Sequence, residues 1–160
     1  MIKIFDKDMN EIKFDIMGYQ MKIFPLDNFS PYGFIMNNLY FPTSEHAFQY
    51  LKYASSDSEI ADKIRKSLSP DEARIIGHQY TSLRDSNWSN IKYEKMEEVL
   101  RLKINQNTIV REALLKTQDY IIAEVCIDED TDWGLDNNGQ GENHLGNIWM
   151  KIRSDLRKED

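Results

Sequence analysis

The stretch from Pro42 to Gln49 places a carboxylate at the start of a predicted helix. Pro42 disfavours helix in the residue before it, and Thr43 or Ser44 can accept a backbone N–H as the N-cap. Glu45 therefore falls in the first turn, where the helix dipole favours its ionised form by about 0.3–1 kcal/mol. A carboxylate held in this way suits a general base or a stabiliser of positive charge better than a general acid. The alternative is that Glu45 only complements the dipole, as acidic residues in first turns commonly do.

A second carboxylate, Asp132, precedes Trp133 in a loop of Asp, Asn and Gly residues. A large aromatic in such a loop folds over something flat or over the core. Trp88 stands where the longest predicted helix starts, and Lys92 lies one turn beyond it on the same face. Carboxylates beside aromatic rings are used to cleave glycosidic bonds, whose transition states carry positive charge on the sugar. This hypothesis requires Glu45 and Asp132 to converge around one sugar-sized hollow, although core packing explains either tryptophan equally well.

Other kinds of site find weaker support. Aspartates alternate from Asp128 to Asp132 as in a calcium-binding loop. However, Trp133 occupies the sixth position, where a glycine is required, and Gly139 occupies the twelfth, where a bidentate Glu belongs. The three histidines lie far apart with no zinc-ligand spacing, and the chain carries neither a nucleophile elbow nor a phosphate-binding loop with its lysine. The sequence thus disfavours hydride, acyl and nucleoside-triphosphate chemistry, and we expect no metal and no organic cofactor.

The glycines near the C-terminal end have two interpretations. Gly139, Gly141 and Gly146 follow the spacing G-x-G-x-x-x-x-G, which differs from the dinucleotide-binding fingerprint and is not followed by a βαβ unit. They can let backbone N–H groups approach a phosphate or ribose at the start of the last helix. Alternatively, they serve a loop that needs positive φ angles.

Length, composition and charge limit the class of protein. A chain of 160 residues fits one domain with a sizeable core. Its single cysteine, Cys126, excludes an internal disulfide, and we find no signal peptide and no run of about 18 apolar residues. We therefore expect a cytoplasmic protein that does not enter a membrane. The formal charge of −7 argues against a broad nucleic-acid surface but permits a small phosphorylated ligand, and the oligomeric state is not indicated.

Hydrophobic periodicity predicts a mainly helical chain with a small sheet, in a single domain over residues 1–160. Residues 1–24 alternate as short strands, around Ile2 and Ile4, Ile12 and Phe14, and Met21 and Ile23. A hairpin with an Asn37-Asn38 turn follows, and residues 120–126 form a later, buried strand. Six helices are predicted. The first starts at residues 43–45, the second follows Asp57 and carries Ile60, Ile64 and Leu68 on one face, and the third starts at Ser69 and ends at Gly77. The fourth starts at about Ser89, and the last two start at their N-caps, Asn107 and Asn143.

Taken together, short motifs resemble the NADAR-domain (YbiA-like) family over about residues 24–153. The motifs are residues 28–31 (NFSP), 42–49 (PTSEHAFQ), 72–77 (EARIIG), 84–85 (RD), Trp88, Lys92, 103–107 (KINQN), 114–117 (LLKT), 132–134 (DWG) and 141–146 (GENHLG). The resemblance implies an α+β fold and an N-glycosidase that hydrolyses the C–N bond of phosphoribosylamino-pyrimidines, which are early intermediates of riboflavin biosynthesis. It also links the chain to ADP-ribose chemistry, including removal of ADP-ribose from guanine in DNA.

The resemblance also assigns roles to residues. It implies that Glu45 and Asp132 are the catalytic acids. The residues implied to bind the substrate are Asn28, Trp88, Lys92, Trp133 and Asn143. The leading hypothesis is therefore hydrolysis of a small phosphorylated N-riboside through an oxocarbenium-like state. Two alternatives are an ADP-ribosyl glycohydrolase acting on guanine or protein, and a non-catalytic sensor of a nucleotide or ADP-ribose.

Overall fold

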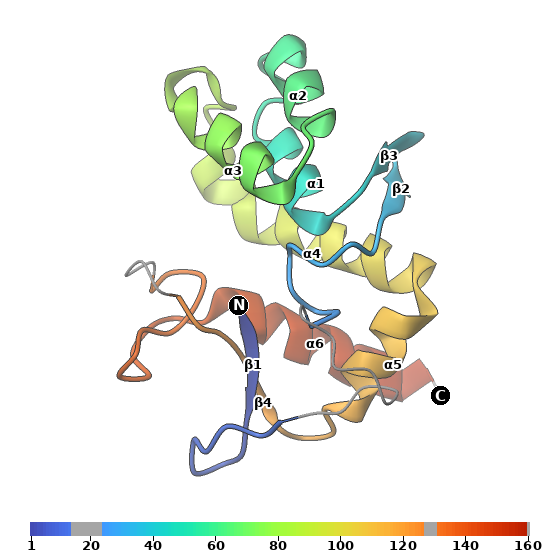
Figure 1. The fold of residues 1–160 in the computed structure, drawn as a ribbon, viewed down its shortest axis with the longest axis vertical. Helices are drawn as coiled ribbons and strands as arrows, with labels where there is room; N and C mark the ends of the chain where they lie inside the picture. The colour runs from blue at the N-terminus through green and yellow to red at the C-terminus, as the bar shows by residue number, and fades with distance from the viewer. Residues whose placement is uncertain (14–23, 127–130, 160) are drawn as a thin grey trace. The chain divides into compact units, whose positions relative to one another are not determined.

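The computed structural model describes residues 1–13, 24–126 and 131–159, and these contain six α-helices and two small antiparallel sheets (Figure 1). The predicted α+β fold is confirmed. The chain forms two compact units, Asn28–Asn107 and Met1–Asp27 with Thr108–Asp160, and each is described by itself. The assignment of residues 1–160 to one domain stays a prediction. No helix of the described residues is long and apolar enough to cross a membrane.

The unit Asn28–Asn107 begins with the predicted hairpin. Strand β2, Phe34–Met36, pairs antiparallel with β3, Leu39–Phe41, and the turn residues Asn37 and Asn38 have φ angles of 52° and 62°. Asparagine tolerates this left-handed region better than most residues, which explains why two of them form the turn. The hairpin leads directly into the helix that carries Glu45 (Figure 1).

Helix α1, Ser44–Leu51, starts as the sequence predicts. Thr43 is the N-cap, and its hydroxyl accepts a hydrogen bond from the backbone N–H of His46. Because α1 packs against α2, α3 and α4, nearly every residue of its first two turns is buried. A helix in this position has little freedom to present a polar side chain to water, so its polar residues must find partners within the unit.

Three further helices surround α1: α2, Ser58–Arg65; α3, Pro70–Gln79; and α4, Trp88–Gln106, which follows the short 3₁₀ segment Thr81–Leu83. Asp57 and Ser69 cap α2 and α3 through their side chains, as predicted. The prediction that Gly77 ends α3 is wrong, because the helix continues to Gln79. Gly77 lies instead where α3 crosses the side chain of Gln49, and a Cβ there would lie only 2.0 Å from Oε1 of Gln49. Close packing, not helix termination, requires this glycine.

The predicted apolar face of α2 also needs correction at one position. Ile60 and Ile64 are buried in a cluster with Tyr53 and Ile76. Leu68, the next residue at the same spacing, lies beyond the end of α2 and is 96% exposed. The helix ends before the periodic pattern does, so Leu68 falls in the connection to α3.

The second unit is built on one strand pair. Strand β1, Ile2–Phe5, pairs antiparallel with β4, Ile121–Glu124, so that Ile2 faces Glu124 and Phe5 faces Ile121. The predicted strand at Ile12 reduces to a short extension, in which the N–H of Ile12 donates to the carbonyl of Ile4. The remaining predicted strand residues, Phe14, Met21 and Ile23, lie outside the described residues.

Two helices complete this unit: α5, Thr108–Lys116, and α6, His144–Glu159. Helix α6 packs on β4 and buries Trp149, whose indole N–H donates to the carbonyl of Leu26 at 3.1 Å. Asn107 uses its amide Nδ2 as a donor to the carbonyl of Lys103, at the end of α4, and its predicted capping of α5 stays a prediction.

Gly146 provides a test of this packing. A Cβ at Gly146 would lie 2.1 Å from the carbonyl oxygen of Ile122, which is backbone and cannot rotate away. Gly→Ala inside a helix usually stabilises by about 0.5–1 kcal/mol. We expect Gly146→Ala to destabilise by about 1–3 kcal/mol instead, as overpacking does. Urea denaturation measures the difference, with exposed Lys151→Ala as the control in the same helix. A stabilised Gly146→Ala variant would contradict the close approach of α6 to β4.

Candidate functional site

Glu45 is a buried carboxylic acid with few polar contacts. Its residue is 7% exposed, and Oε1 accepts a hydrogen bond of 2.8 Å from Nε2 of Gln49, one turn later in α1. Its backbone N–H donates to the carbonyl of Asn28 at 3.0 Å, which fixes the first turn of the helix to the start of the unit. The carboxyl is therefore held at a defined position by groups from two segments.

Burial raises the pKa of the Glu45 carboxyl above its usual range, because the ionised form loses the solvation of water. The hydrogen bond from Gln49 and the positive charges of Lys52 and Arg74 act in the opposite direction, while Asp71 adds to the rise. The sequence argument considered only the helix dipole and predicted a stabilised carboxylate. Since desolvation dominates, Glu45 retains its proton more readily than an exposed glutamate and is suited to donate it.

A buried lysine organises the same helix start. Lys103 of α4 is fully buried, and its Nζ donates to the hydroxyl of Ser30 at 2.9 Å and to that of Ser44 at 3.3 Å. The hydroxyl of Ser44 in turn donates to Oδ1 of Asn28 at 3.0 Å. Asn28, predicted to bind substrate, therefore belongs to a polar network that holds the residue preceding Glu45.

The predicted aromatic residue of this unit lies in the core. Trp88 is 3% exposed, and its ring packs on Phe48 with a centroid distance of 5.1 Å. The ammonium group of Lys52 lies 5.5 Å from the centroid of the same Phe48 ring. Lys92 is half-buried, one turn beyond Trp88, with its Nζ 4.7 Å from the ring centroid of Tyr93. Core packing, the alternative weighed for Trp88, agrees with this burial.

The second predicted carboxylate lies in the other unit, beside a histidine. Oδ1 of Asp132 is 3.6 Å from Nε2 of His144, and both side chains are about one-third exposed. The backbone of the same two residues is also joined, because the N–H of His144 donates to the carbonyl of Asp132 at 3.3 Å. Asp132 is thus accessible to water and has a partner that becomes cationic on protonation.

Loop carbonyls occupy the start of α6. The N–H of Leu145 donates to the carbonyl of Trp133 at 3.1 Å, and the N–H of Asn143 donates to that of Gly134 at 3.3 Å. These N–H groups are the donors that a phosphate at a helix N-terminus would use. Because these N–H groups already donate to carbonyls of the loop, they argue against the interpretation of the glycines as a phosphate-binding site. The same hydrogen bonds hold the Asp132-Trp133-Gly134 segment against the helix.

The side chain of Asn143 is committed to β4. Its Nδ2 donates to the carbonyl of Ile122 at 2.9 Å, and its Oδ1 accepts from the N–H of Glu124 at 3.1 Å. Asn143 stands directly before α6, at the predicted N-cap position, and its side chain links the loop to the strand through these two bonds. Its role as a substrate ligand stays a prediction. Its φ of 51° is one that asparagine adopts more easily than most residues.

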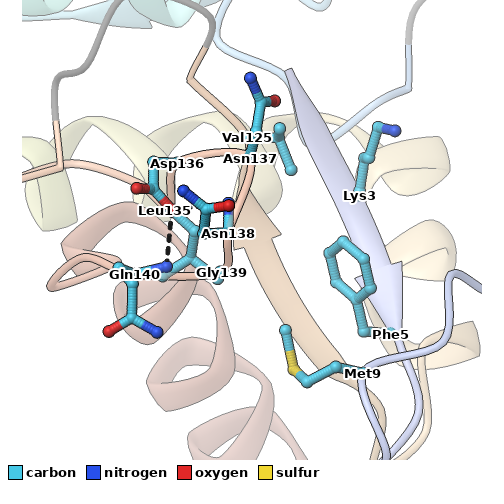
Figure 2. Close-up of a pocket in the computed structure, with 10 residues that line it drawn as sticks. All are labelled: Lys3, Phe5, Met9, Val125, Leu135, Asp136, Asn137, Asn138, Gly139 and Gln140. Atoms are coloured by element: carbon cyan, nitrogen blue, oxygen red, sulfur yellow. Dashed lines mark hydrogen bonds between the residues drawn. The ribbon is translucent and has the colours of Figure 1, made fainter.

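A cavity of about 530 Å³ lies elsewhere in the same unit (Figure 2). Figure 2 shows Phe5 and Met9 on one side and the loop 135–140 on the other, with Asp136 and Gln140 hydrogen-bonded to each other. None of the predicted site residues lines this cavity. In the part of the chain that the structure describes, no three His, Cys, Asp or Glu residues are placed to hold a metal ion.

The predicted site residues thus form two groups. In the first group, a backbone hydrogen bond joins Glu45 to Asn28. In the second group, Asp132, Trp133 and Asn143 lie together at the start of α6, where the loop is hydrogen-bonded to the helix and to β4. Glu45 and Asp132 belong to different units, and their convergence stays a prediction.

Sequence reasoning gave no role to two buried lysines. Lys103 continues the buried face of α4 marked by Met96 and Leu100, and Lys52, the C-cap of α1, lies one turn beyond the buried Phe48. A lysine within an apolar stripe was therefore the signal that could have found them, because lysine is rarely buried without a specific partner.

Most of the chain is similar to one family of known proteins. The model of the NADAR domain family matches residues 8–157. N-glycosidase Npun_R5314 from Nostoc punctiforme is 34% identical over 131 residues, which are 81% of this chain and 83% of that protein. Riboflavin biosynthesis protein VVA0006 from Vibrio vulnificus is 30% identical over 133 residues, which are 83% of this chain but 35% of that protein.

A solved structure shares the fold. The NMR structure of YbiA from Escherichia coli superposes with a TM-score of 0.75 at 31% identity, and the match covers 84% of this chain and 79% of YbiA. The sequence of N-glycosidase YbiA from Escherichia coli is 32% identical over 132 residues, which are 82% of this chain and 81% of that protein.

The burial of Glu45 predicts an unusual effect on stability. With a folded-state pKa above the unfolded one, the ionised carboxyl destabilises the native state at neutral pH, and this cost disappears below the unfolded pKa. We expect Glu45→Gln to raise the free energy of unfolding at pH 7 by about 1.4 kcal/mol for each unit of pKa difference. The gain over wild type should shrink as the pH falls.

Urea denaturation of both proteins from pH 4 to pH 8 measures this difference. Glu59, an exposed first-turn glutamate of α2, provides the matched control. Glu59→Gln loses only a favourable dipole interaction and should lower stability slightly at pH 7. If Glu45→Gln instead lost stability at pH 7 as Glu59→Gln does, the buried-acid description of Glu45 would be wrong.

Proposed function

This chain belongs to the NADAR domain family, and from that premise we propose that it hydrolyses the C–N glycosidic bond of phosphoribosylamino-pyrimidine intermediates of riboflavin biosynthesis. Relatives named as N-glycosidases support the class of enzyme, a hydrolase acting on N-glycosyl bonds. The names of two relatives as riboflavin biosynthesis proteins support the substrate class. The substrate itself is a small phosphorylated N-riboside.

The observation that carries the proposal is the buried carboxyl of Glu45. A glycosidic nitrogen is a poor leaving group until it accepts a proton, and a carboxylic acid whose pKa is raised by burial can supply one. In the proposed reaction Glu45 donates its proton to the departing nitrogen while the bond from C1 of the ribose to that nitrogen breaks. The electron pair of the bond leaves with the pyrimidine amine, and the sugar passes through an oxocarbenium-like state.

We assign the complementary task to Asp132. Its side chain is partly solvated beside His144, an environment that suits an ionised carboxylate. A carboxylate can stabilise the positive charge on the sugar or remove a proton from the attacking water. Water then adds to C1, ribose 5-phosphate is released with the free amine, and no cofactor enters the scheme.

The substrate-binding residues divide by their chemistry. Lys92 is the candidate for the phosphate, because this cationic residue of α4 is only half-buried. Trp133 is the candidate for stacking on the pyrimidine, since its side chain is only half-buried. Asn28, Trp88 and Asn143 support the site from within their own units, through the contacts described above.

Removal of either carboxyl tests these roles. Proton transfer by a positioned group contributes about 10²- to 10⁴-fold to rate, so Glu45→Gln and Asp132→Asn should each lower kcat by at least about 10²-fold. Chromatography of the pyrimidine and ribose 5-phosphate released from a phosphoribosylamino-pyrimidine measures the rate. Glu59→Gln and Glu142→Gln, which alter exposed glutamates, should leave it near the wild-type value.

Each assay is run in parallel on a guanine nucleoside that carries ADP-ribose. Release of ADP-ribose alone would replace the proposed substrate with the ADP-ribosyl alternative. Saturable binding of both compounds without release of any base would identify a sensor. Near-normal turnover in Glu45→Gln would remove Glu45 from the reaction.

A further inference from the structure

We propose that Gln49 is a positioning residue for the proposed reaction: its amide holds Oε1 of Glu45, so that Oε2 is the oxygen presented to the substrate. Gly77 contributes to this positioning, because the absence of a side chain at this residue lets the amide of Gln49 pack against α3. The inference rests on the proposed function, in which Glu45 is the reacting acid.

The geometry links three residues from two helices. Gln49 is 3% exposed, and its Nε2 lies 2.8 Å from Oε1 of Glu45. On its other side, the amide rests on Gly77, where a Cβ would come within 2.0 Å of Oε1 and 2.8 Å of Cδ of Gln49. Any side chain at position 77 therefore displaces the group that holds the carboxyl of Glu45.

The amide of Gln49 is only half satisfied. Its Oε1 is buried and has no hydrogen-bond partner among the described residues. A buried polar atom without a partner lowers stability, and an apolar side chain of the same size would avoid that loss. A residue that served the core alone would not need this amide, whereas a residue that orients Glu45 does.

The hydrogen bond also affects how Glu45 ionises. A bond donated to a carboxylate is stronger than one donated to a neutral acid, so it favours the ionised form. The charged groups facing Glu45 are Lys52, the C-cap of α1, and Asp71 and Arg74 of α3, and Lys103 of α4 reaches the adjacent Ser44. These charges stay in place when Gln49 is replaced, so a change in the ionisation of Glu45 then reports the lost bond.

The first experiment replaces Gln49 with an apolar residue of similar size. In Gln49→Met we expect a melting temperature equal to or above that of wild type, because the unpartnered oxygen is removed. We also expect the pKa of Glu45 to rise. Carbon-13 NMR of the side-chain carboxyls measures that pKa without substrate, and the Glu45→Gln spectrum assigns the signal. Turnover of the phosphoribosylamino-pyrimidine should fall about 10- to 100-fold, as expected when a reacting group loses its orientation.

The second experiment uses Gly77. In the wild-type background, Gly77→Ala should raise the pKa of Glu45 and lower turnover, as Gln49→Met does. In a Gln49→Ala background the amide is absent, so adding Gly77→Ala should change neither quantity, although the new Cβ still lies 3.2 Å from the Cβ of residue 49. Two variants that touch the same hydrogen bond are non-additive in this way.

The outcomes separate this inference from the proposed function. An unchanged pKa of Glu45 in Gln49→Met overturns the positioning role, as does a Gly77→Ala effect of equal size in both backgrounds. If wild-type protein releases no base from the phosphoribosylamino-pyrimidine, the proposed function fails, while the NMR titration still decides whether Gln49 holds Glu45.

Discussion

The burial of one carboxyl at the start of α1 is the constraint on which the rest of the first unit depends. The pKa of Glu45 rises because water is excluded, and its neighbours limit that rise without removing it. Gln49 supplies one hydrogen bond, and cationic groups of α1 and α3 supply longer-range attraction. A helix start that only needed a favourable charge would leave the glutamate in water, as α2 does with Glu59.

The second unit holds a partly exposed carboxylate, that of Asp132, on a loop. Asp132 and its neighbours give their carbonyls to the N–H groups of α6, while the amide of Asn143 bonds to the backbone of β4. Gly134 and Gly146 bring the loop and the helix close to β4, where a Cβ would meet the carbonyls of Glu124 and Ile122. The loop that carries Asp132 is therefore braced by backbone contacts on both sides.

Local signals in the sequence predicted the elements well. The threonine before α1, the two asparagines of the hairpin and the serine-proline start of α3 act within a few residues of themselves, so their roles could be recognised directly. The prediction that Gly77 ends α3 was wrong because glycine occurs both at helix ends and where two elements pack closely. Only the structure shows that Gln49, 28 positions earlier, lies against it.

The ionisation of Glu45 could not be predicted for a similar reason. The dipole of a helix is visible in the sequence, but desolvation depends on what α2, α3 and α4 place around the side chain. Asn143 shows the same limit, because its cap-like position hides two bonds to a strand that lies about 20 residues earlier. The family motifs predicted which residues form the candidate site, and the structure shows the contacts that each of them makes.

In the proposed reaction, Glu45 acts as a protonated acid in the cleavage of an N-ribosyl bond. The pH dependence of kcat/KM for a phosphoribosylamino-pyrimidine tests it most directly, with Glu45→Gln measured alongside wild type. We expect the wild-type value to fall as the pH rises through a pKa above the usual range of a glutamate, and we expect no such fall in the residual activity of the variant. The same fall in both proteins, or no fall in wild type, would show that Glu45 is not the acid.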